Sequence, residues 1–530
     1  MRQVPAQSNL QGGGLEARED GAWRRQLWVA AVAAVSVAAV WICYQRVSTF
    51  RVIDDAYITY TYARNVAEWN GFQFSDRYTT LGTTTPLFTL LLALCANLGV
   101  AIPKTALALD FLALALQIFL AAALFHYLDR SRWIPLLVLF FSVLMWWHTP
   151  SMPGMEYGLY TACCMGALVA VCLSNWVAAG LFAATAATLR VDGGLILLLT
   201  ACAWALHARC RGPMRARVAF LLALVLLPAV WYSYSLAVFG RFTPQSLDTR
   251  RVEAIGAGFF KYGWHYYLFN RHTLSYLLMA SFLGLCLAIR RRPRTVWFAV
   301  FFVSYVVMYI SFGLPDVPGY YCPLQWMAIV FAGFALAETL HTILRRSAPR
   351  LSRAGVAATC LGLALVVACS LNDLRWGIGI WRYSLQSAKR THKLLLYKAI
   401  ALWMNERLPA DTRFATNEIG VLGYFAGRDL LEIGGLVNKE GLDYLRSGKI
   451  GELVARMDPE VIVVPDPFID AIVLSPGGEM VRGFNELATM VGEADGLRVR
   501  VWVRKEWLSP ERLEEERGEL QRFVAETREL

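Results

Sequence analysis

Long apolar blocks separated by short polar loops make up roughly the first two-thirds of the chain. Most blocks contain about 15 to 25 residues, close to the roughly 20 that a helix needs to cross the hydrocarbon core of a bilayer. The blocks are continuous and lack the alternation of apolar and polar residues that marks a transmembrane strand. Since only helices and closed barrels satisfy the backbone inside lipid, this pattern predicts an α-helical polytopic membrane protein.

Clusters of arginine between the blocks predict the orientation of the chain. The clusters lie at residues 24–25, 130–132, 209–217, 290–294 and 345–353. Basic loops of membrane proteins stay mostly in the cytoplasm, so an even number of crossings should separate neighbouring clusters. The last three intervals contain four, two and two apolar blocks. We therefore expect these loops and the N-terminal tail, residues 1–26, to be cytoplasmic.

The first interval departs from this parity because it contains three apolar stretches, at 27–44, 86–101 and 105–128. The stretch 86–101 is the shortest and begins with a proline. We expect it to form a non-spanning helix on the outer membrane surface, inside a first outer loop at residues 47–104. About eleven spans then remain in a membrane domain at 27–372. They are predicted at 27–44, 105–128, 134–148, 157–173, 176–189, 193–207, 218–239, 272–289, 295–313, 320–340 and 354–372.

The remaining tail, residues 373–530, is predicted to be a soluble α/β domain outside the cytoplasm. Its apolar patterns indicate strands at 412–419, 430–435, 461–465 and 497–503, and helices at 395–408, 442–457 and 510–530. The glycine-rich segment GVLGYFAG at 420–427 lacks the strand-turn-helix context of a nucleotide-binding loop. A turn-rich sheet connection is the favoured interpretation of that segment.

Composition agrees with this organisation. Hydrophobic residues make up 57% of the chain, well above the usual content of a soluble enzyme. The mean hydropathy is +0.43. The formal net charge of +11 could suggest nucleic-acid binding. However, the basic residues fall in short loops between apolar blocks, which is the ordinary topology signal of a membrane protein. We therefore expect membrane lipids around the chain and no nucleic-acid partner.

Polar residues gather at the predicted outer ends of the spans. Asp54 and Asp55 open the string IDDAYITYTYARNVAEWNGFQF, a few residues beyond the first span. Paired carboxylates so close to a membrane suit cation binding or acid–base chemistry, although they could also cap a helix at 56–69. Other outer-end residues are Glu156 in PGMEYGLY, Arg190 and Asp192 in LRVDGG, Gln245 and Arg250 in FGRFTPQSLDTR, and Tyr320 in LPDVPGYYCP.

The string DDAYITYTYARNVAEWNGFQF and the following GTTTPLFTLLLAL resemble the first outer loop of the GT-C superfamily of polyprenyl-phosphate-sugar glycosyltransferases. The chain is most similar to the branch that contains the mycobacterial terminal arabinofuranosyltransferase. The later strings PGMEYGLY, LRVDGG, FGRFTPQSL and GVLGYFAGRDLLEIGGLV are also similar to segments of that branch. The chain departs from the branch at Thr61, Tyr157 and Val191, where arginine, threonine and proline are common. These departures leave the sugar and the acceptor open.

The resemblance implies an integral membrane glycosyltransferase that uses a polyprenyl-phosphate-linked sugar donor. The acceptor would be a glycan, lipid or protein of the cell envelope, and the anomeric centre would be inverted. Asp54 or Asp55 would act as base, with Asp55 preferred because it adjoins the helix. Phosphate-binding candidates are Arg190, Arg250 and Lys261; Glu156 and Asp192 would bind sugar hydroxyls or a cation; and Arg64, Gln245 and Tyr320 complete the predicted substrate-binding set.

Three questions stay open in the sequence. Asp55 and Glu156 could instead hold a divalent cation such as Mg or Mn, since some members of the superfamily use one. A transporter or lipid-linked-sugar flippase would also have many spans, and Asp110 is the main candidate for a charge inside the membrane. A non-catalytic scaffold would tolerate loss of the outer-loop acids. In each case we expect a multi-pass protein of the inner or plasma membrane.

Overall fold

The structure is a computed structural model that describes residues 52–128, 152–207, 213–253, 274–313, 317–346, 392–493 and 495–529, together with residues 31, 34 and 35. Three of the predicted spans, at 27–44, 134–148 and 354–372, lie wholly or almost wholly outside the described residues. The predicted cytoplasmic tail at 1–26 also lies outside them.

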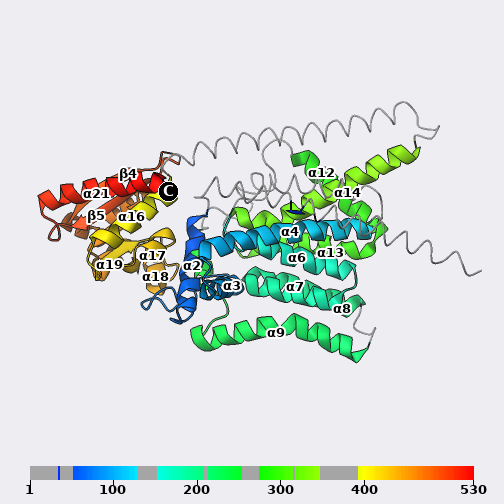
Figure 1. The fold of residues 1–530 in the computed structure, drawn as a ribbon. Coiled ribbons are helices and arrows are strands. Elements are labelled where there is room, and N and C mark those ends of the chain that lie inside the picture. The colour runs from blue at the N-terminus through cyan, green and yellow to red at the C-terminus, as the bar shows by residue number, and fades with distance from the viewer. Residues whose placement is uncertain are drawn as a thin grey trace, which may run out of the picture.

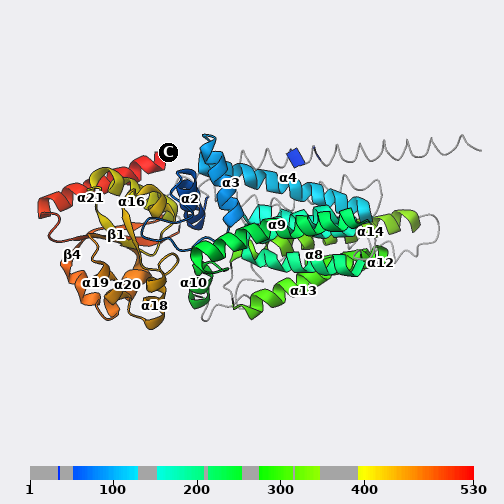
Figure 2. The same cartoon turned by 90° about the horizontal axis from the view of Figure 1, so that it is seen from below.

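The other eight predicted spans are helices in the described part of the chain. Most of them run side by side and form one bundle, with the C-terminal domain at one end (Figures 1 and 2). Continuous apolar sequence favours this arrangement because a helix satisfies its own backbone groups wherever water is absent. The helices are α4 (Ile102–Leu128), α6 (Tyr157–Cys172), α7 (Trp176–Leu189), α8 (Gly194–His207), α9 (Met214–Phe239), α12 (Leu274–Arg291), α13 (Val296–Ser311) and α14 (Cys322–Arg346).

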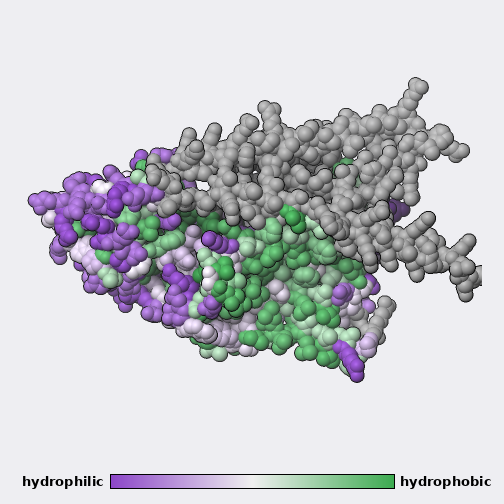
Figure 3. All heavy atoms as spheres, viewed as in Figure 1, coloured by the Kyte–Doolittle hydropathy of each residue, from purple (hydrophilic) through white to green (hydrophobic). Residues whose placement is uncertain are grey.

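The outside of the bundle is apolar. Figure 3 shows hydrophobic residues over the bundle and hydrophilic residues over the C-terminal domain. Helix α9, for example, exposes Leu222, Leu226 and Val230. Within the described ranges, four helical segments are long and apolar enough to cross a membrane: Ile102–Leu128, Met214–Phe239, Pro293–Ser311 and Gly319–Thr339. The chain is therefore a helical membrane protein, and the number of about eleven spans stays a prediction.

Two helices of the first outer loop lie between the bundle and the C-terminal domain. They are α2 (Asp54–Ala67) and α3 (Pro86–Asn97). Helix α3 begins with a proline, whose missing N–H leaves no bond unmade in a first turn. Its 12 residues extend about 18 Å, less than the roughly 30 Å of a hydrocarbon core. Together, Figures 1 and 2 show that α3 crosses the end of the bundle rather than running along it. Its position on the outer membrane surface stays a prediction.

The C-terminal domain contains a mixed five-stranded sheet in the order β2-β1-β3-β5-β4. Strands β2, β1 and β3 are parallel, and β5 and β4 continue the sheet in antiparallel pairing. In the parallel register, Phe414 lies opposite Leu430 on β2 and Val461 on β3. The strands are β1 (Arg413–Thr416), β2 (Asp429–Glu432), β3 (Val461–Pro465), β4 (Phe484–Val491) and β5 (Arg498–Arg504).

Helices cover both faces of the sheet. Along β3, Val461 and Val463 belong to the core on one face, while Ile462 and Val464 belong to the core on the other. This division follows from the period of two along a strand. Helices α16 (Lys393–Arg407) and α21 (Pro510–Glu529) cover the first face; α19 (Ile450–Met457) and α20 (Asp466–Leu474) cover the second.

The predicted elements of this domain need three corrections. Strand β4 was not predicted, and neither was α20. The predicted helix at 442–457 consists of two helices, α18 (Lys439–Ser447) and α19, which separate at Gly448 and Lys449. The segment at 420–427 connects β1 to β2 as expected, but it contains a short helix, α17 (Val421–Phe425).

The first outer loop and the C-terminal domain share one hydrophobic core. Aromatic side chains of the loop, among them Tyr62, Phe72 and Phe74, pack in the same cluster as α16 and one face of the sheet. Tyr62 is fully buried and donates its hydroxyl hydrogen bond to the carbonyl of Thr80 at 2.7 Å. The domain is thus attached to the outer loop by packed side chains.

Candidate active site

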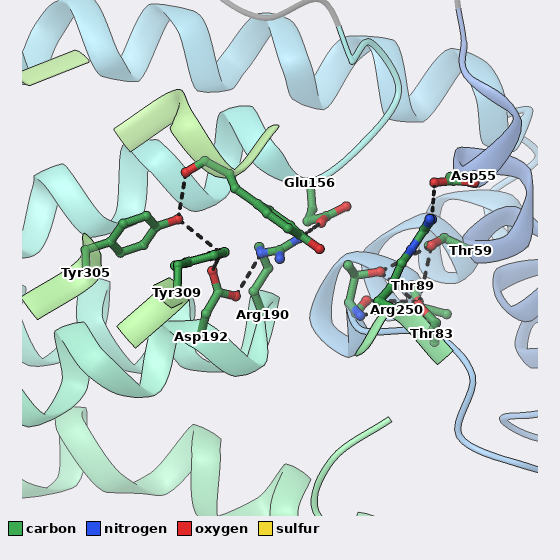
Figure 4. Close-up of polar contacts among 12 residues, drawn as sticks. Asp55, Thr59, Thr83, Thr89, Glu156, Arg190, Asp192, Arg250, Tyr305 and Tyr309 are labelled. Carbon is green, nitrogen blue, oxygen red and sulfur yellow. Dashed lines mark hydrogen bonds and ion pairs between the residues drawn. The ribbon is translucent and has the colours of Figure 1, made fainter. Parts of the chain in front are cut away.

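A cavity of about 380 Å³ lies where the bundle, the first outer loop and the C-terminal domain meet. Its walls come from α2, the loop at 82–85, the turn between α7 and α8, α10 (Gln245–Glu253), α13 and the 3₁₀ turn η3 (Pro318–Tyr321). The C-terminal domain contributes Leu436. Figure 4 shows two polar clusters on these walls, one around Arg190 and the other around Arg250. The volume of the cavity lies within the usual range of pockets that bind small organic ligands.

The first cluster contains an ion pair between Asp55 and Arg250. Asp55 is the second residue of α2, and its Oδ2 lies 2.7 Å from Nη2 of Arg250 on α10. The two side chains are 41% and 31% exposed, so this carboxylate remains accessible from the cavity. The N-terminal end of a helix favours an anionic side chain, which fits the position of Asp55. These two sequence-predicted residues are therefore brought together.

Three threonine hydroxyls lie beside this pair. Oγ1 of Thr59, one helical turn after Asp55, is 3.4 Å from Oγ1 of Thr83 and 3.3 Å from Oγ1 of Thr85. The two loop hydroxyls are 3.0 Å apart. All three residues are buried in the protein and line the cavity. Sequence reasoning did not select them, although the repeated threonine in GTTTP was a usable signal.

The second cluster surrounds Arg190, which lies in extended backbone between α7 and the 3₁₀ turn η1 (Val191–Gly193). Its Nη1 is 2.5 Å from Oε1 of Glu156, and its Nε is 2.9 Å from Oδ1 of Asp192. The hydroxyl of Tyr309 on α13 donates to the other oxygen of Asp192 at 2.5 Å. The guanidinium of Arg190 therefore faces two carboxyl groups, those of Glu156 and Asp192.

Tyrosine rings enclose the same guanidinium. The Cζ of Arg190 lies 4.7 Å from the ring centre of Tyr157, 5.5 Å from that of Tyr160 and 5.3 Å from that of Tyr320. Contacts of this kind attract a cation to the ring face. Tyr157 and Tyr320 also line the cavity. Tyr320 was predicted to bind substrate, and that role stays a prediction, whereas Tyr157 and Tyr309 were not selected from the sequence.

Asp54 points away from the cavity, although it adjoins Asp55. Its side chain is buried, and its Oδ1 accepts a hydrogen bond from the backbone N–H of Val421 at 2.9 Å. The nearby ion pair between Lys393 and Glu418 has an N–O distance of 2.7 Å. Burial raises the pKa of Asp54 from 3.8 to about 7, while the charge of Lys393 lowers it and that of Glu418 raises it. Asp54 thus joins α2 to the C-terminal domain.

Three other predicted residues lie outside the cavity walls. Arg64, near the end of α2, donates to the carbonyl of Tyr424 at 2.8 Å and belongs to the contact with the C-terminal domain. Gln245 is buried and donates to the carbonyl of Gly435 at 3.1 Å. Glu156 holds Arg190 from behind. Lys261 lies outside the described residues.

The proposed metal ligands Asp55 and Glu156 belong to separate clusters (Figure 4). Among the described residues, no group of three or more His, Cys, Asp or Glu side chains could hold a metal ion. The side chains present therefore do not fit a divalent-cation site of the predicted kind. No chemical step below uses one.

Comparison with known proteins identifies a domain family and a fold. Residues 382–509 match a family described as a domain of unknown function, DUF8728. No curated protein matches the chain in sequence. The matched segment covers most of the C-terminal domain and none of the bundle.

Solved structures resemble nearly the whole chain. The crystal structure of ArnT from Cupriavidus metallidurans bound to undecaprenyl phosphate matches with a TM-score of 0.53 at 13% sequence identity, and covers 90% of this chain and 99% of that chain. The apo form of the same protein matches with a TM-score of 0.50 at 11% identity, covering 88% and 98%. The chain therefore has an ArnT-like fold. Both the resemblance to the GT-C superfamily and the arabinofuranosyltransferase branch stay predictions from the sequence.

Proposed function

We propose that this chain is an integral membrane glycosyltransferase that moves a sugar from a polyprenyl-phosphate donor to an acceptor on the outer face of the membrane. The observation that carries this proposal is the cavity that holds the Asp55–Arg250 pair at the start of α2. The fold is shared with ArnT, a GT-C glycosyltransferase that has been crystallised with undecaprenyl phosphate. A catalytic carboxylate and a phosphate-binding arginine are the groups that such a transfer needs.

The walls of the cavity suit a donor that is part lipid and part sugar. Apolar side chains from the bundle, Leu195, Met308 and Phe312, line one side. Phe312 is half exposed, and this apolar side would be the one that meets the lipid part of the donor. The first prenyl units of the donor would lie here, and its phosphate and sugar would reach the polar clusters.

The phosphate would bind at the α10 end of the cavity. Arg250 and Arg251 both line the cavity. Nη1 of Arg251 lies 3.9 Å from Oδ1 of Asp248. The other oxygen of Asp248, Oδ2, lies 2.6 Å from Nη2 of Arg241. Among the described residues, three guanidinium groups thus face two carboxylates, Asp55 and Asp248, which gives this end a positive balance. The planar fork of an arginine presents five N–H donors, a geometry that suits a phosphate.

The sugar would bind toward the Arg190 end. There, among the described residues, the two carboxylates of Glu156 and Asp192 face one guanidinium, that of Arg190, so this end favours hydrogen-bond donors such as sugar hydroxyls over a phosphate. The rings of Tyr157 and Tyr320 offer flat apolar faces for a sugar ring. In this assignment, Arg190 orients the two acids and the rings. Arg250 rather than Arg190 is the principal phosphate ligand.

The reaction follows from these positions. The oxygen of the acceptor hydroxyl attacks the anomeric carbon of the donor sugar, and the carboxylate of Asp55 accepts the proton of that hydroxyl. The bond between that carbon and the phosphate oxygen breaks, and its electron pair leaves with the phosphate. Arg250 stabilises the negative charge that develops on the leaving group, and fixed donors act most strongly where water is excluded. Attack opposite the leaving phosphate inverts the anomeric centre.

A transfer assay in detergent tests this proposal with synthetic polyprenyl-phosphate sugars and a panel of envelope acceptors. Asp55→Asn should lower kcat by about 10²- to 10⁴-fold, the usual contribution of a general base. Asp429→Asn is the matched control because Asp429 forms a comparable ion pair with Arg77, at 2.5 Å and 36% exposure, away from the cavity.

Equal activity of wild type and Asp55→Asn would contradict the assignment of the base. If proteoliposomes move the lipid-linked sugar between leaflets, and no sugar is transferred to any acceptor of the panel, the result would contradict the enzyme class and favour a flippase.

Asp110 is the main candidate for the charge that a transporter would need. Its Oδ2 accepts a hydrogen bond from the N–H of Gly154 at 2.5 Å. This bond gives Asp110 a structural role between α4 and the segment before α6.

A further inference from the structure

Glu432, at the end of β2, organises a loop of the C-terminal domain. The residue is fully buried. Its Oε1 accepts backbone N–H bonds from Gly434 at 2.6 Å and Leu436 at 3.2 Å. Its Oε2 accepts bonds from Val437 at 3.3 Å and Asn438 at 2.8 Å. Since each oxygen accepts two N–H groups, a single side chain fixes the course of residues 434–438, here called the Glu432 loop.

The Glu432 loop holds α10. The carbonyl of Gly435 accepts hydrogen bonds from Nε2 of Gln245 at 3.1 Å and from Oγ1 of Thr249 at 2.6 Å. Gly435 has left-handed backbone, with φ of +82°, and an added Cβ would lie 2.7 Å from Cα of Leu442. Only glycine therefore allows this carbonyl to point at α10 without strain. Thr249 directly precedes Arg250.

The same loop holds the segment that leads to the threonine cluster. The hydroxyl of Thr80 donates to the carbonyl of Val437 at 2.5 Å, and the backbone N–H of Glu432 donates to the hydroxyl of Tyr78 at 2.9 Å. The N–H of Gln245 donates to the carbonyl of Leu81 at 2.8 Å, which closes the connection between α10 and the outer loop. Two residues after Leu81, Thr83 lines the cavity.

The Glu432 loop therefore ties together the two segments that supply Arg250 and Thr83, and it places Leu436 in the cavity wall itself. We propose that Glu432 is a positioning residue for the transfer reaction, and that the C-terminal domain forms an integral part of the reaction chamber. This inference rests on the proposed function. Glu432 acts through Arg250 and Thr83, because its carboxylate is fully engaged by backbone groups of its own loop.

Glu432→Gln tests this proposal in the full-length protein. Glutamine has nearly the same volume, but its NH₂ group would face two backbone N–H donors that now bond an oxygen. We expect the loop to shift, KM for the polyprenyl-phosphate sugar to rise, and kcat/KM to fall about 10- to 100-fold, as small displacements of positioned groups do. Hydrogen exchange in residues 245–253 should become faster. Thr249→Val is the milder second variant, since it removes one bond to Gly435 and leaves Glu432 intact.

Glu516→Gln is the matched control. Glu516 is also buried in the C-terminal domain, where it accepts a hydrogen bond from Nε1 of Trp403 at 2.9 Å and pairs with Arg407. Within the described part of the chain, these contacts of Glu516 lie apart from the Glu432 loop. This variant should lower the melting temperature while kcat/KM and exchange in 245–253 stay at wild-type values.

The exchange measurement does not depend on transfer, so it separates the two proposals. Unchanged exchange in residues 245–253 of both Glu432→Gln and Thr249→Val would overturn the positioning role, whatever the enzyme does. Equal losses of kcat/KM in Glu432→Gln and Glu516→Gln would also overturn it, because the effect would then be general destabilisation. Faster exchange with no transfer by wild type would support the coupling and contradict the proposed function alone.

Discussion

The opposite directions of Asp54 and Asp55 predict different results for the same chemical change. Asparagine at position 54 keeps an oxygen that can accept the hydrogen bond from Val421, and it removes a buried charge. Leucine at this position has a similar size but leaves that N–H without a partner. Asp54→Asn should therefore remain folded and retain transfer within about threefold of wild type. Asp54→Leu should lose the contact between α2 and α17.

The magnitudes follow from burial. An unpaired buried donor costs about 1–3 kcal/mol, so Asp54→Leu should be less stable by that amount. Burial raises the pKa of Asp54 from 3.8 to about 7. At about 1.4 kcal/mol for each pKa unit, this shift corresponds to a pH-dependent change of roughly 4 kcal/mol in the free energy of unfolding. Because the pKa in the folded state lies above the ordinary value, the stabilisation is complete below pH 3.8 and is lost as pH rises through about 7.

The assay is thermal unfolding in detergent between pH 5.5 and 8.5, with transfer measured on the same samples. Wild type should melt at lower temperature as pH rises toward 7, and Asp54→Asn should show a flatter profile. At pH 8, this variant should melt no lower than wild type. Loss of transfer in folded Asp54→Asn, together with active Asp55→Asn, would refute the reasoning and make Asp54 the base.

Other substitutions should separate binding from chemistry in the cavity. Arg250→Lys keeps a charge but loses the planar fork, so steady-state kinetics should show KM for the donor about 10-fold higher; an unchanged KM would remove phosphate binding from Arg250. Tyr309→Phe deletes the hydrogen bond to Asp192, and kcat/KM should fall about 10-fold because bonds to charged groups contribute about 1.5–3 kcal/mol. Thr83→Val should lower kcat/KM by less than 10-fold and lower the melting temperature slightly, because it removes the hydroxyl that bonds Thr85; a large loss of stability would show that the threonine cluster is structural.

The helices of the bundle could be predicted because one physical demand controls them. Apolar runs that exclude water must form helices, and their ends follow the polar residues. Helix α7 was predicted at 176–189 and has those bounds, and α6 differs from its prediction by one residue at its end. Alternate residues of the strand VIVVP pack into the cores on opposite faces of the sheet, which likewise follows from strand geometry.

The features that were missed depend on contacts made after folding. Strand β4 has a register shift between Glu486 and Ala488, so its buried positions do not alternate regularly and the period-two signal is lost. Tyr309 lies in a largely apolar helix, α13, whose sequence contains no charged residue that would mark a site. Its role becomes visible only when Asp192, more than one hundred residues earlier, lies at hydrogen-bond distance.

The pair at the start of α2 shows most clearly where sequence reasoning ends. Neighbouring positions on an α-helix point about 100° apart, so a helix between two bodies must direct adjacent side chains toward different partners. Two adjacent aspartates can then have different roles, one structural and one in the cavity. The local sequence does not show which aspartate has which role. Here the C-terminal domain decides, because α17 supplies a backbone N–H to Asp54 while α10 supplies a guanidinium to Asp55. The different roles of Asp54 and Asp55 are therefore set only when both α17 of the C-terminal domain and α10 pack against the first outer loop.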